Sequence, residues 1–325
     1  MADILALAAS NLVSPMILSF VLGLAAALAR SDLTVPEAVA KGMSLYLLFA
    51  IGFKGGAAVA AHGVDGRLIA ALLAGVLLSA LLPLIAYALI RGMTRLGPTD
   101  AAAVAAHYGS ISIVTFVTAS SVLQAQGIAS EGYMVAVAAA MEAPARLASH
   151  SAVRMAGAQR DADPDLWREI AFNGSIVLLV GSFLIGLATG ETGLAKIDAF
   201  IVAPFQGILC LFLLDMGLVA GRGLKGARGV LGGGTLAFGL LMPLIGAALG
   251  LATALLLGLS TGGVALLMVL CASASYIAVP AAMRVALPAA NPALSLTLAL
   301  GVTFPFNLTL GIPLYVAVAQ ALSGA

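Results

Sequence analysis

The chain has 325 residues, of which 62% are hydrophobic and 9% are charged, and its formal net charge is +1 at pH 7. Soluble domains carry about 25% charged residues, so this composition excludes an ordinary soluble protein. The near-zero net charge gives no reason to expect a nucleic-acid partner. We therefore expect an all-α polytopic membrane protein that lies in the lipid bilayer.

Long apolar segments follow one another along the whole chain. A membrane-spanning helix needs about 20 mostly apolar residues, and ten segments meet that length: about 13–29, 36–61, 68–90, 99–126, 130–149, 168–189, 197–221, 229–257, 262–286 and 292–320. The longest polar stretch separates the fifth segment from the sixth and predicts a linker over 150–167. The chain then divides into two five-helix units, at 1–149 and 168–325.

Basic residues are distributed unevenly over the predicted loops. Most of them lie after helices 1, 3, 5, 7 and 9: Arg30, Arg91, Arg95, Arg154, Arg160, Arg168, Arg222, Lys225 and Arg228. The opposite side has little beyond Arg67 and Lys196. Because basic loops stay in the cytoplasm, we expect a multi-pass inner-membrane protein with a cytoplasmic linker and both termini outside the cytoplasm.

The two units resemble each other. At an offset of 165 residues, Gly52 in helix 2 meets Gly217 in helix 7, and Ser110 in helix 4 meets Ser275 in helix 9. Five helices is an odd number, so two like units must sit upside down relative to each other in the membrane. Inverted repeats with a binding site at their interface are a recurring design of transporters.

Helices 4 and 9 each contain a polar motif at membrane depth. The motif at 107–115 places five polar or ring-polar side chains around a glycine, and the motif at 273–280 contains two serines and a proline. We expect both helices to be broken there, so that backbone N–H groups and serine hydroxyls meet at one spot. These neutral donors suit a small monovalent anion and predict its binding residues: Gly109, Ser110, Ser112, Ser273, Ala274, Ser275 and Tyr276. The alternative is that the serines bond to their own helix or join neighbouring helices.

Two acidic residues lie inside apolar helices, Glu142 in helix 5 and Asp215 in helix 7. Carboxylates at membrane depth are costly and usually face a cavity or a partner. With the hydroxyl of Thr115, they predict a sodium site next to the anion. The alternatives are that a basic residue pairs with them, Arg146, Arg222 or Lys54, or that they simply lie close to the membrane surface. Lys54 is near the outer end of helix 2, where a lysine ordinarily extends its ammonium group to the membrane–water interface.

The sequence shows no catalytic nucleophile, metal-ligand spacing or phosphate loop. We therefore expect no enzymatic activity and no cofactor other than sodium as a coupling ion.

At these motifs the sequence resembles the sodium-dependent bicarbonate permeases of the cyanobacterial carbon-concentrating type and their proteobacterial relatives. The resemblance is carried by residues 51–56, 107–116, 142–145, 213–218 and 274–284. It implies a ten-helix homotrimer in which a core domain moves against a gate domain, with bicarbonate and sodium at the broken helices. It also implies a PII-like regulator on the cytoplasmic side. Lys54 departs from the cyanobacterial pattern, where a small polar residue is expected.

The sequence thus predicts a sodium-coupled symporter that imports bicarbonate. One alternative is a carrier for another small monovalent anion or a monocarboxylate. Another, from a different class, is a membrane sensor that transports nothing and recruits a PII-like protein. Two paired broken helices favour a carrier, since a sensor needs only one binding state.

Overall fold

The structure is a computed structural model, and it describes residues 13–63, 66–142, 174–226, 231–276 and 279–323, apart from 281–282 and 284–286. The predicted linker at 150–167 lies outside the described residues. The helices of the described part are α2 (Pro15–Leu28), α3 (Glu37–His62), α4 (Gly66–Met93), α5 (Pro98–His107), α6 (Ile113–Ala125), α7 (Met134–Glu142), α10 (Gly174–Ile201), α11 (Phe205–Gly226), α12 (Gly233–Leu256), α13 (Thr261–Ala272), α15 (Pro292–Leu298), α16 (Phe304–Phe306) and α17 (Ile312–Ser323). Two wide π-helical stretches, η1 (Ala299–Thr303) and η2 (Asn307–Gly311), join the last three into one long helix.

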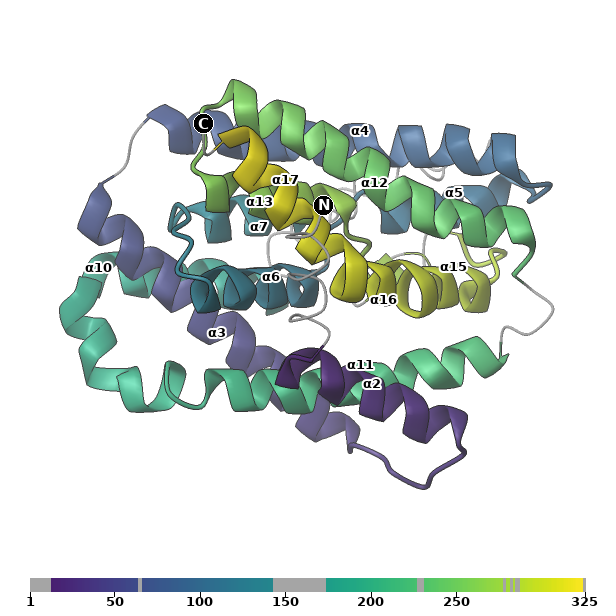
Figure 1. Cartoon of the computed structure of the whole chain (residues 1–325), viewed down its shortest axis with the longest axis horizontal. Helices are drawn as coiled ribbons and strands as arrows, with labels where there is room; N and C mark the ends of the chain where they lie inside the picture. Colours follow the sequence, from purple (N-terminus) through teal and green to yellow (C-terminus); the bar gives the residue numbers. More distant parts are fainter. Residues whose placement is uncertain are drawn as a thin grey trace.

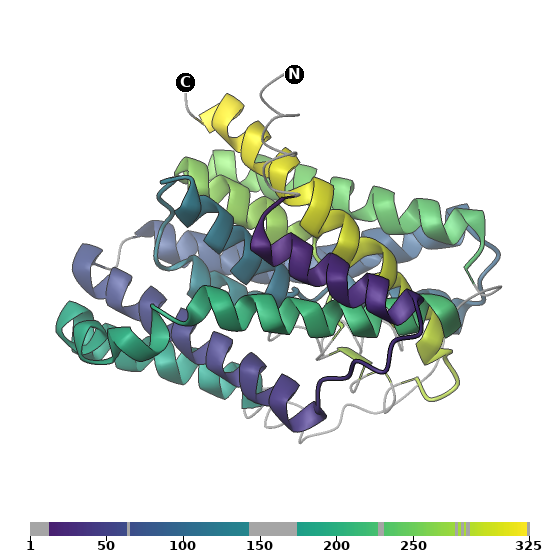
Figure 2. The same ribbon diagram turned by 60° about the horizontal axis from the view of Figure 1, so that its bottom comes forward.

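The helices form two groups. In the first, which we call the panel, α3 packs along α10 and α2 packs along α11. The panel lies in the lower half of Figure 1, and α2 runs beside α11 again in Figure 2. In the second group, which we call the bundle, α4 packs on α5, α7 and α12, while α13 packs on α6, α12 and α17. The predicted motifs at 107–115 and 273–280 lie in the bundle.

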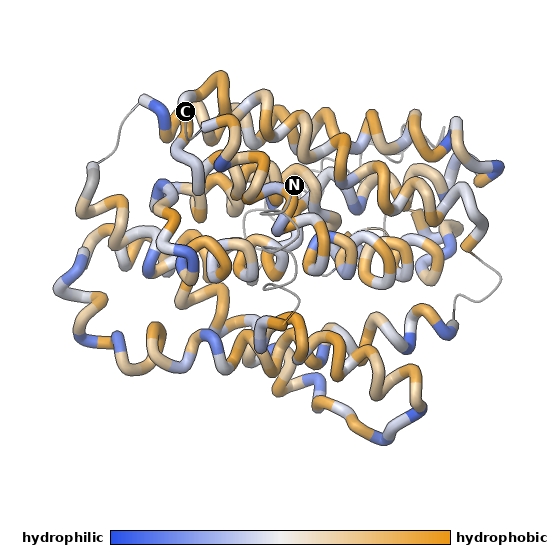
Figure 3. The backbone as a smooth tube through the Cα atoms, in the orientation of Figure 1, coloured by the Kyte–Doolittle hydropathy of each residue, from blue (hydrophilic) through white to orange (hydrophobic). Residues whose placement is uncertain are grey.

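The described helices are apolar along their length and polar at their ends, as Figure 3 shows. Six are long and apolar enough to cross a membrane: Glu37–Ala61, Gly66–Met93, Val177–Ile201, Phe205–Lys225, Gly233–Leu256 and Pro292–Ser323. Pro15–Leu28, Ile113–Ala125 and Thr261–Ala272 are shorter apolar helices. The chain is therefore a multi-pass membrane protein built from helices, and the number of ten spans stays a prediction.

Helix α10 differs from the expectation. The glycines and polar residues at 190–193 predicted the end of one span, with the next beginning near 197. A helix does end at Gly190, where the backbone leaves helical geometry, but a second helix continues from this kink to Ile201, and α11 begins only at Phe205. Gly190 has φ of 58° and ψ of −153°, which a residue with a side chain rarely adopts. The predicted end is confirmed, and the difference is the second helical segment that follows the kink within α10.

Glycines bring α3 and α10 into backbone contact. A Cβ atom at Gly56 of α3 would overlap the carbonyl oxygen of Phe183, and one at Gly186 of α10 would overlap the carbonyl oxygen of Phe53. Small residues allow this close approach, which contributes much of the packing energy between helices in lipid.

The pair of α2 and α11 is built in the same way. A Cβ atom at Gly217 of α11 would overlap the carbonyl oxygen of Phe20, and one at Gly23 of α2 would overlap that of Leu214. Each pair of the panel thus has a glycine on either helix that faces a carbonyl oxygen of the other.

These contacts predict a large effect of one methyl group. We expect Gly56→Ala to lower the thermal stability of the purified protein markedly, because the added carbon must push two backbones apart, and overpacking costs about 1–3 kcal/mol. Gly42→Ala, on the same helix, is the matched control, since no atom lies within 4 Å of its added carbon. The measurement is the melting temperature of both variants in detergent. Equal melting temperatures would show that α3 and α10 do not touch at Gly56.

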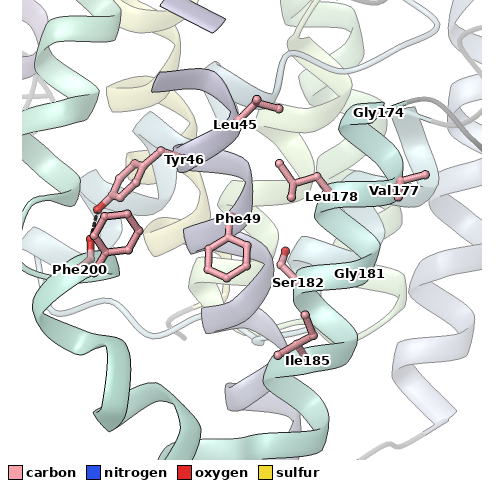
Figure 4. A pocket seen from close by; sticks show the side chains of 10 residues that line it. All are labelled: Leu45, Tyr46, Phe49, Gly174, Val177, Leu178, Gly181, Ser182, Ile185 and Phe200. Atoms are coloured by element: carbon pink, nitrogen blue, oxygen red, sulfur yellow. Dashed lines mark hydrogen bonds between the residues drawn. The ribbon is translucent and has the colours of Figure 1, made fainter. Parts of the chain in front are cut away.

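The panel carries an apolar groove of about 570 Å³ between α3 and α10 (Figure 4). Phe49 and Leu178 face each other across it, and the Tyr46 hydroxyl donates to the carbonyl oxygen of Phe200 at 2.6 Å. The hydrogen bond satisfies the polar atom of the tyrosine, so the groove has a surface suited to lipid acyl chains.

Candidate functional site

The two polar motifs cross each other in the bundle and are joined by hydrogen bonds. The backbone N–H of Ser275 donates to the carbonyl oxygen of His107 at 2.8 Å, and the Ser112 N–H donates to Ser273 Oγ at 2.9 Å. His107 Nδ1 lies 2.6 Å from the carbonyl oxygen of Ser275. Because a carbonyl oxygen only accepts, Nδ1 carries the proton. We call this region the crossing.

Local signals explain why the helices stop at the crossing. Helix α5 ends at His107 and α6 begins at Ile113, with Ser112 as its N-cap. Ser112 Oγ accepts from the N–H and the hydroxyl of Thr115, at 3.3 Å and 2.9 Å. On the other helix, α13 ends at Ala272, and Ser273 Oγ donates to the carbonyl oxygen of Leu270 at 2.8 Å. Side chains thus replace helical partners on both sides.

A small cavity lies at the crossing, with a volume of about 20 Å³. That is room for one guest the size of a water molecule. We call it the crossing cavity. Helices α3, α6 and α7 and both breaks contribute to it, and its lining is Ser44, Leu48, Ile111, Ser112, Ile113, Glu142, Ser275 and Tyr276.

Glu142 reaches this cavity from the last residue of α7. The end of α7 is held by Ser79, whose hydroxyl donates to the Met141 carbonyl oxygen at 3.1 Å. Glu142 is 7% exposed, and its Oε2 has no hydrogen-bond partner among the described residues. The Tyr276 hydroxyl, beside Ser112, also lacks a hydrogen bond of normal geometry. Buried oxygens without partners are costly, so they indicate a site for a ligand that oxygen atoms can bind.

The predicted site residues are only partly brought together. Ser112, Ser275, Tyr276 and Glu142 line one cavity, although they were assigned to two different ligands. Asp215 does not line it: this residue is on α11 of the panel, and its strongest attraction among the described residues is to Arg222.

The remaining predicted residues lie around the crossing. Ser110 Oγ is buried and has no partner among the described residues. The Gly109 N–H donates to the Ala106 carbonyl oxygen at 3.2 Å, so it is already used within the protein. Thr115 bonds to Ser112, as described, and Ala274 is buried within the second break.

The last long helix supports both breaks, which the sequence did not predict. Asn307 Nδ2 donates to the carbonyl oxygen of Ala272, at the end of α13, at 2.8 Å. Thr303 Oγ1 donates to the Gly239 carbonyl oxygen at 2.8 Å and lies 2.6 Å from the Tyr108 hydroxyl. Because the threonine proton is used, Tyr108 is the donor of that second bond.

A signal for this support was present in the sequence. Thr303 and Asn307 lie in an apolar segment on either side of Pro305, and Pro313 follows two residues after η2 ends. A proline inside a helix removes a backbone donor, and π-helical turns are frequent at functional sites. Polar residues next to a proline could therefore have been counted with the motifs of helices 4 and 9.

Comparison with known proteins identifies the family of the chain. No curated protein matches the chain. The family model of the Na+-dependent bicarbonate transporter superfamily, however, matches residues 15–320, which is nearly the whole chain and includes the crossing and the panel. The chain belongs to the Na+-dependent bicarbonate transporter superfamily.

Proposed function

We propose that the chain is a sodium-coupled symporter that imports bicarbonate across the inner membrane, and that it is a carrier rather than an enzyme. The observation that carries the proposal is the crossing cavity, where a buried carboxylate oxygen of Glu142 without a partner meets hydroxyl oxygens from both breaks. Carboxylate, hydroxyl and carbonyl oxygens are the ligands of hard cations.

The size of the cavity supports sodium as its occupant. A bare sodium ion is smaller than a water molecule and fits about 20 Å³, whereas bicarbonate has four non-hydrogen atoms and does not. Two cavity-lining residues, Ser44 and Leu48, come from α3 of the panel, while the breaks belong to the bundle. The anion therefore needs the panel to move away from the crossing, which is the motion expected of alternating access.

We further propose that the ten predicted helices form two inverted repeats. Matching contacts support this. Gly217 faces the carbonyl oxygen of Phe20 in the same way as Gly56 faces that of Phe183. On the partner helices, Gly23 and Gly186 each face a carbonyl oxygen three residues before Gly217 and Gly56, respectively. The register differs from the sequence comparison, since Gly56 rather than Gly52 corresponds to Gly217. The shift is one helical turn.

A second pair of contacts supports the repeat. Asp100 at the start of α5 accepts from the N–H of Asn291 at 2.8 Å. Glu131 accepts from the N–H of Ser260, before α13, at 2.6 Å. In each case an acid joins the start of one broken helix to the start of the helix that comes after the other broken helix in the chain.

Orientation gives a prediction that needs no transport assay. Arg222 and Lys225 donate to the carbonyl oxygens of Leu33 and Ala27, so basic residues gather at one end of the panel. In the bundle, Arg67 at the start of α4 donates to the Gly258 carbonyl oxygen, just after α12. The described end of the chain is nearby, where Ser323 donates to Thr261. If the basic end is cytoplasmic, both termini and Ser323 lie outside.

After Ala325, we expect a reporter that is active only in the periplasm to give a signal and a cytoplasmic reporter to give none. Near Asp161, we expect the opposite result. The measurement is the activity of paired cytoplasmic and periplasmic reporters at both positions. The reverse pattern would overturn the orientation.

The homotrimer and the PII-like regulator on the cytoplasmic side are proposals that rest on the resemblance of the sequence. Cross-linking in membranes measures the first, and pull-down of a purified PII-like protein by the purified transporter measures the second.

Uptake of radiolabelled bicarbonate into proteoliposomes, with and without an inward sodium gradient, tests the main proposal. Sodium-dependent uptake supports it. Uptake that another small anion or monocarboxylate supports better would favour the alternative substrate. No uptake of any anion, together with binding of a PII-like protein, would favour the sensor.

A further inference from the structure

A third cavity lies between the panel and the bundle. Its volume is about 270 Å³, and it is lined by α3 and the first residue of α11 from the panel, and by α6, α7, the segment before α7 and α13 from the bundle. Its polar lining residues include Lys54, Ser120, Ser121, Gln124 and Glu131. We call it the Lys54 cavity. With about 30 Å³ for each water molecule, it has room for a small anion with part of its hydration shell.

The Lys54 cavity and the crossing cavity lie end to end along the same helices. On α3, Ser44 and Leu48 line the crossing cavity, and Ile51 and Ala58 line the Lys54 cavity. These positions are three, four or seven residues apart, so they share one face of the helix.

Helix α6 shows the same order of the two cavities along its length, and we call this line from one cavity to the other the seam. Ile113 lines the crossing cavity, whereas Phe116 and Ser120 line the Lys54 cavity at the following turns. Ile51 and Phe116 are buried between the two. Both are apolar, and one belongs to the panel and the other to the bundle.

Lys54 is the basic residue of this lining. Its Nζ lies 4.9 Å from the ring centroid of Phe205, an arrangement in which the ring attracts the cation. In the described part of the chain Lys54 has no hydrogen bond or ion pair. Asp198 attracts it electrostatically from α10. The side chain therefore stays in the cavity, next to the ring, with N–H donors available to a guest.

The acid in the same lining does not neutralise this charge at close range. Both carboxylate oxygens of Glu131 accept hydrogen bonds from Ser260, one from its N–H and one from its hydroxyl at 2.9 Å. Glu131 therefore acts as a cap for the start of α13, and Lys54 gives the cavity a positive centre.

We propose that the Lys54 cavity is an outer access site for a small monovalent anion, which Lys54 holds before it passes Ile51 and Phe116 to the crossing. The proposal rests on the proposed transport of an anion and adds its route and first contact. The seam leads toward the ends of α3 and α6, His62 and Ala125, on the side that the charge distribution places outside. A cleft lined by charges of one sign raises the local concentration of an oppositely charged ligand by about 10- to 1,000-fold. Because Lys54 is a single, half-buried charge that Asp198 partly offsets, we expect an effect at the lower end of this range.

Thiol labelling tests the charge of the cavity without any transport. Ser120→Cys places a thiol in the lining, and membrane-impermeant anionic and cationic methanethiosulfonates are added outside right-side-out vesicles. Each rate is divided by the rate of the same reagent with a free thiol. The parent chain, with its own Cys210 and Cys271, gives the background.

We expect the anionic reagent to be favoured about three- to tenfold over the cationic one. The preference should disappear when Lys54→Gln is added and remain with Lys54→Arg. Added bicarbonate should slow the reaction. An unchanged preference in Lys54→Gln, or no labelling from outside at all, would overturn the proposal.

Uptake kinetics separate this proposal from the function on which it rests. We expect Lys54→Gln to raise the KM for bicarbonate about three- to tenfold, to change the maximal rate by less than about twofold, and to leave the sodium dependence as it is. Lys41→Gln, on the exposed end of the same helix, is the matched control and should leave the KM unchanged. Charge-dependent labelling without bicarbonate uptake would refute the proposed substrate and keep the access site. Sodium-driven uptake with charge-independent labelling would refute the access site alone.

Discussion

Glu142→Gln is expected to raise the sodium concentration for half-maximal uptake by at least about tenfold. The substitution keeps the shape of the side chain but removes the charge from the crossing cavity, where Oε2 has no partner among the described residues. Interactions with a charged group contribute about 1.5–3 kcal/mol, and about 1.4 kcal/mol corresponds to a factor of ten. The measurement is bicarbonate uptake into proteoliposomes over a range of external sodium, with the amount of folded transporter determined in parallel.

Two further variants decide what the result means. Glu191→Gln changes an exposed acid on α10 and should leave the sodium dependence unaltered. Asp215→Asn changes the other predicted sodium ligand, which lies outside the crossing cavity, so we expect a smaller shift than for Glu142. A shift as large as that of Glu142→Gln would indicate a separate sodium site on α11. Normal sodium dependence of Glu142→Gln would show that Glu142 has a structural role.

Ser275→Ala and Ser110→Ala are expected to weaken bicarbonate binding by roughly 10- to 150-fold each, because each removes a hydrogen bond of about 1.5–3 kcal/mol to a charged ligand. Ser275 lines the crossing cavity, and Ser110 has a buried hydroxyl without a partner among the described residues. Neither hydroxyl makes a hydrogen bond to another described residue, so the melting temperature should change little. If both contact one ligand, the double variant should lose less than the two single effects combined.

Ser273→Ala is the contrasting variant from the same set of predicted residues. Its hydroxyl donates to Leu270 and accepts from the Ser112 N–H, so its removal leaves a buried donor without an acceptor. We expect a lower melting temperature with a smaller loss of affinity. The measurements are uptake kinetics and thermal shift in bicarbonate for the three single variants and the double variant. Wild-type affinity in both Ser275→Ala and Ser110→Ala would end the case for this anion site, and the transporter assignment would stand.

The helical class and the places of the breaks could be predicted because lipid leaves few alternatives. Backbone groups in lipid must be satisfied within a helix or a closed barrel, so apolar length alone locates most helices. Polar residues around Gly109 stood out against that background, and the structure does end α5 at His107 and begin α6 at Ile113. The glycine at 190 gave the same signal and also ends a helix, because its positive φ and its ψ of −153° are not helical, and a second helix follows at once.

Contacts between distant segments were harder to predict. A repeat of glycines every few residues in an apolar chain allows several registers, and only the carbonyl that each glycine faces selects one. For this reason the sequence comparison paired Gly217 with Gly52, whereas the contacts pair Gly217 with Gly56, one helical turn further along α3. Asp215 and Glu142 looked alike in sequence, since both are acids at membrane depth. They differ in helix packing, because α7 reaches the crossing and the acid on α11 does not line its cavity.

The hydrogen bonds that join the two breaks have a thermodynamic consequence. Ser275 and His107 bind each other through two bonds, so the breaks cannot separate without leaving buried polar groups unpaired. The residues of the two breaks then keep one arrangement, and the part of the cavity lining that can move away belongs to the panel, Ser44 and Leu48. In the sodium-coupled carrier that we propose, accumulation is set by the gradients of the coupled ions. If this carrier moves one sodium ion with each bicarbonate, transport carries no net charge and the membrane potential adds nothing, so a tenfold sodium gradient, about 1.4 kcal/mol, supports at most about a tenfold bicarbonate gradient.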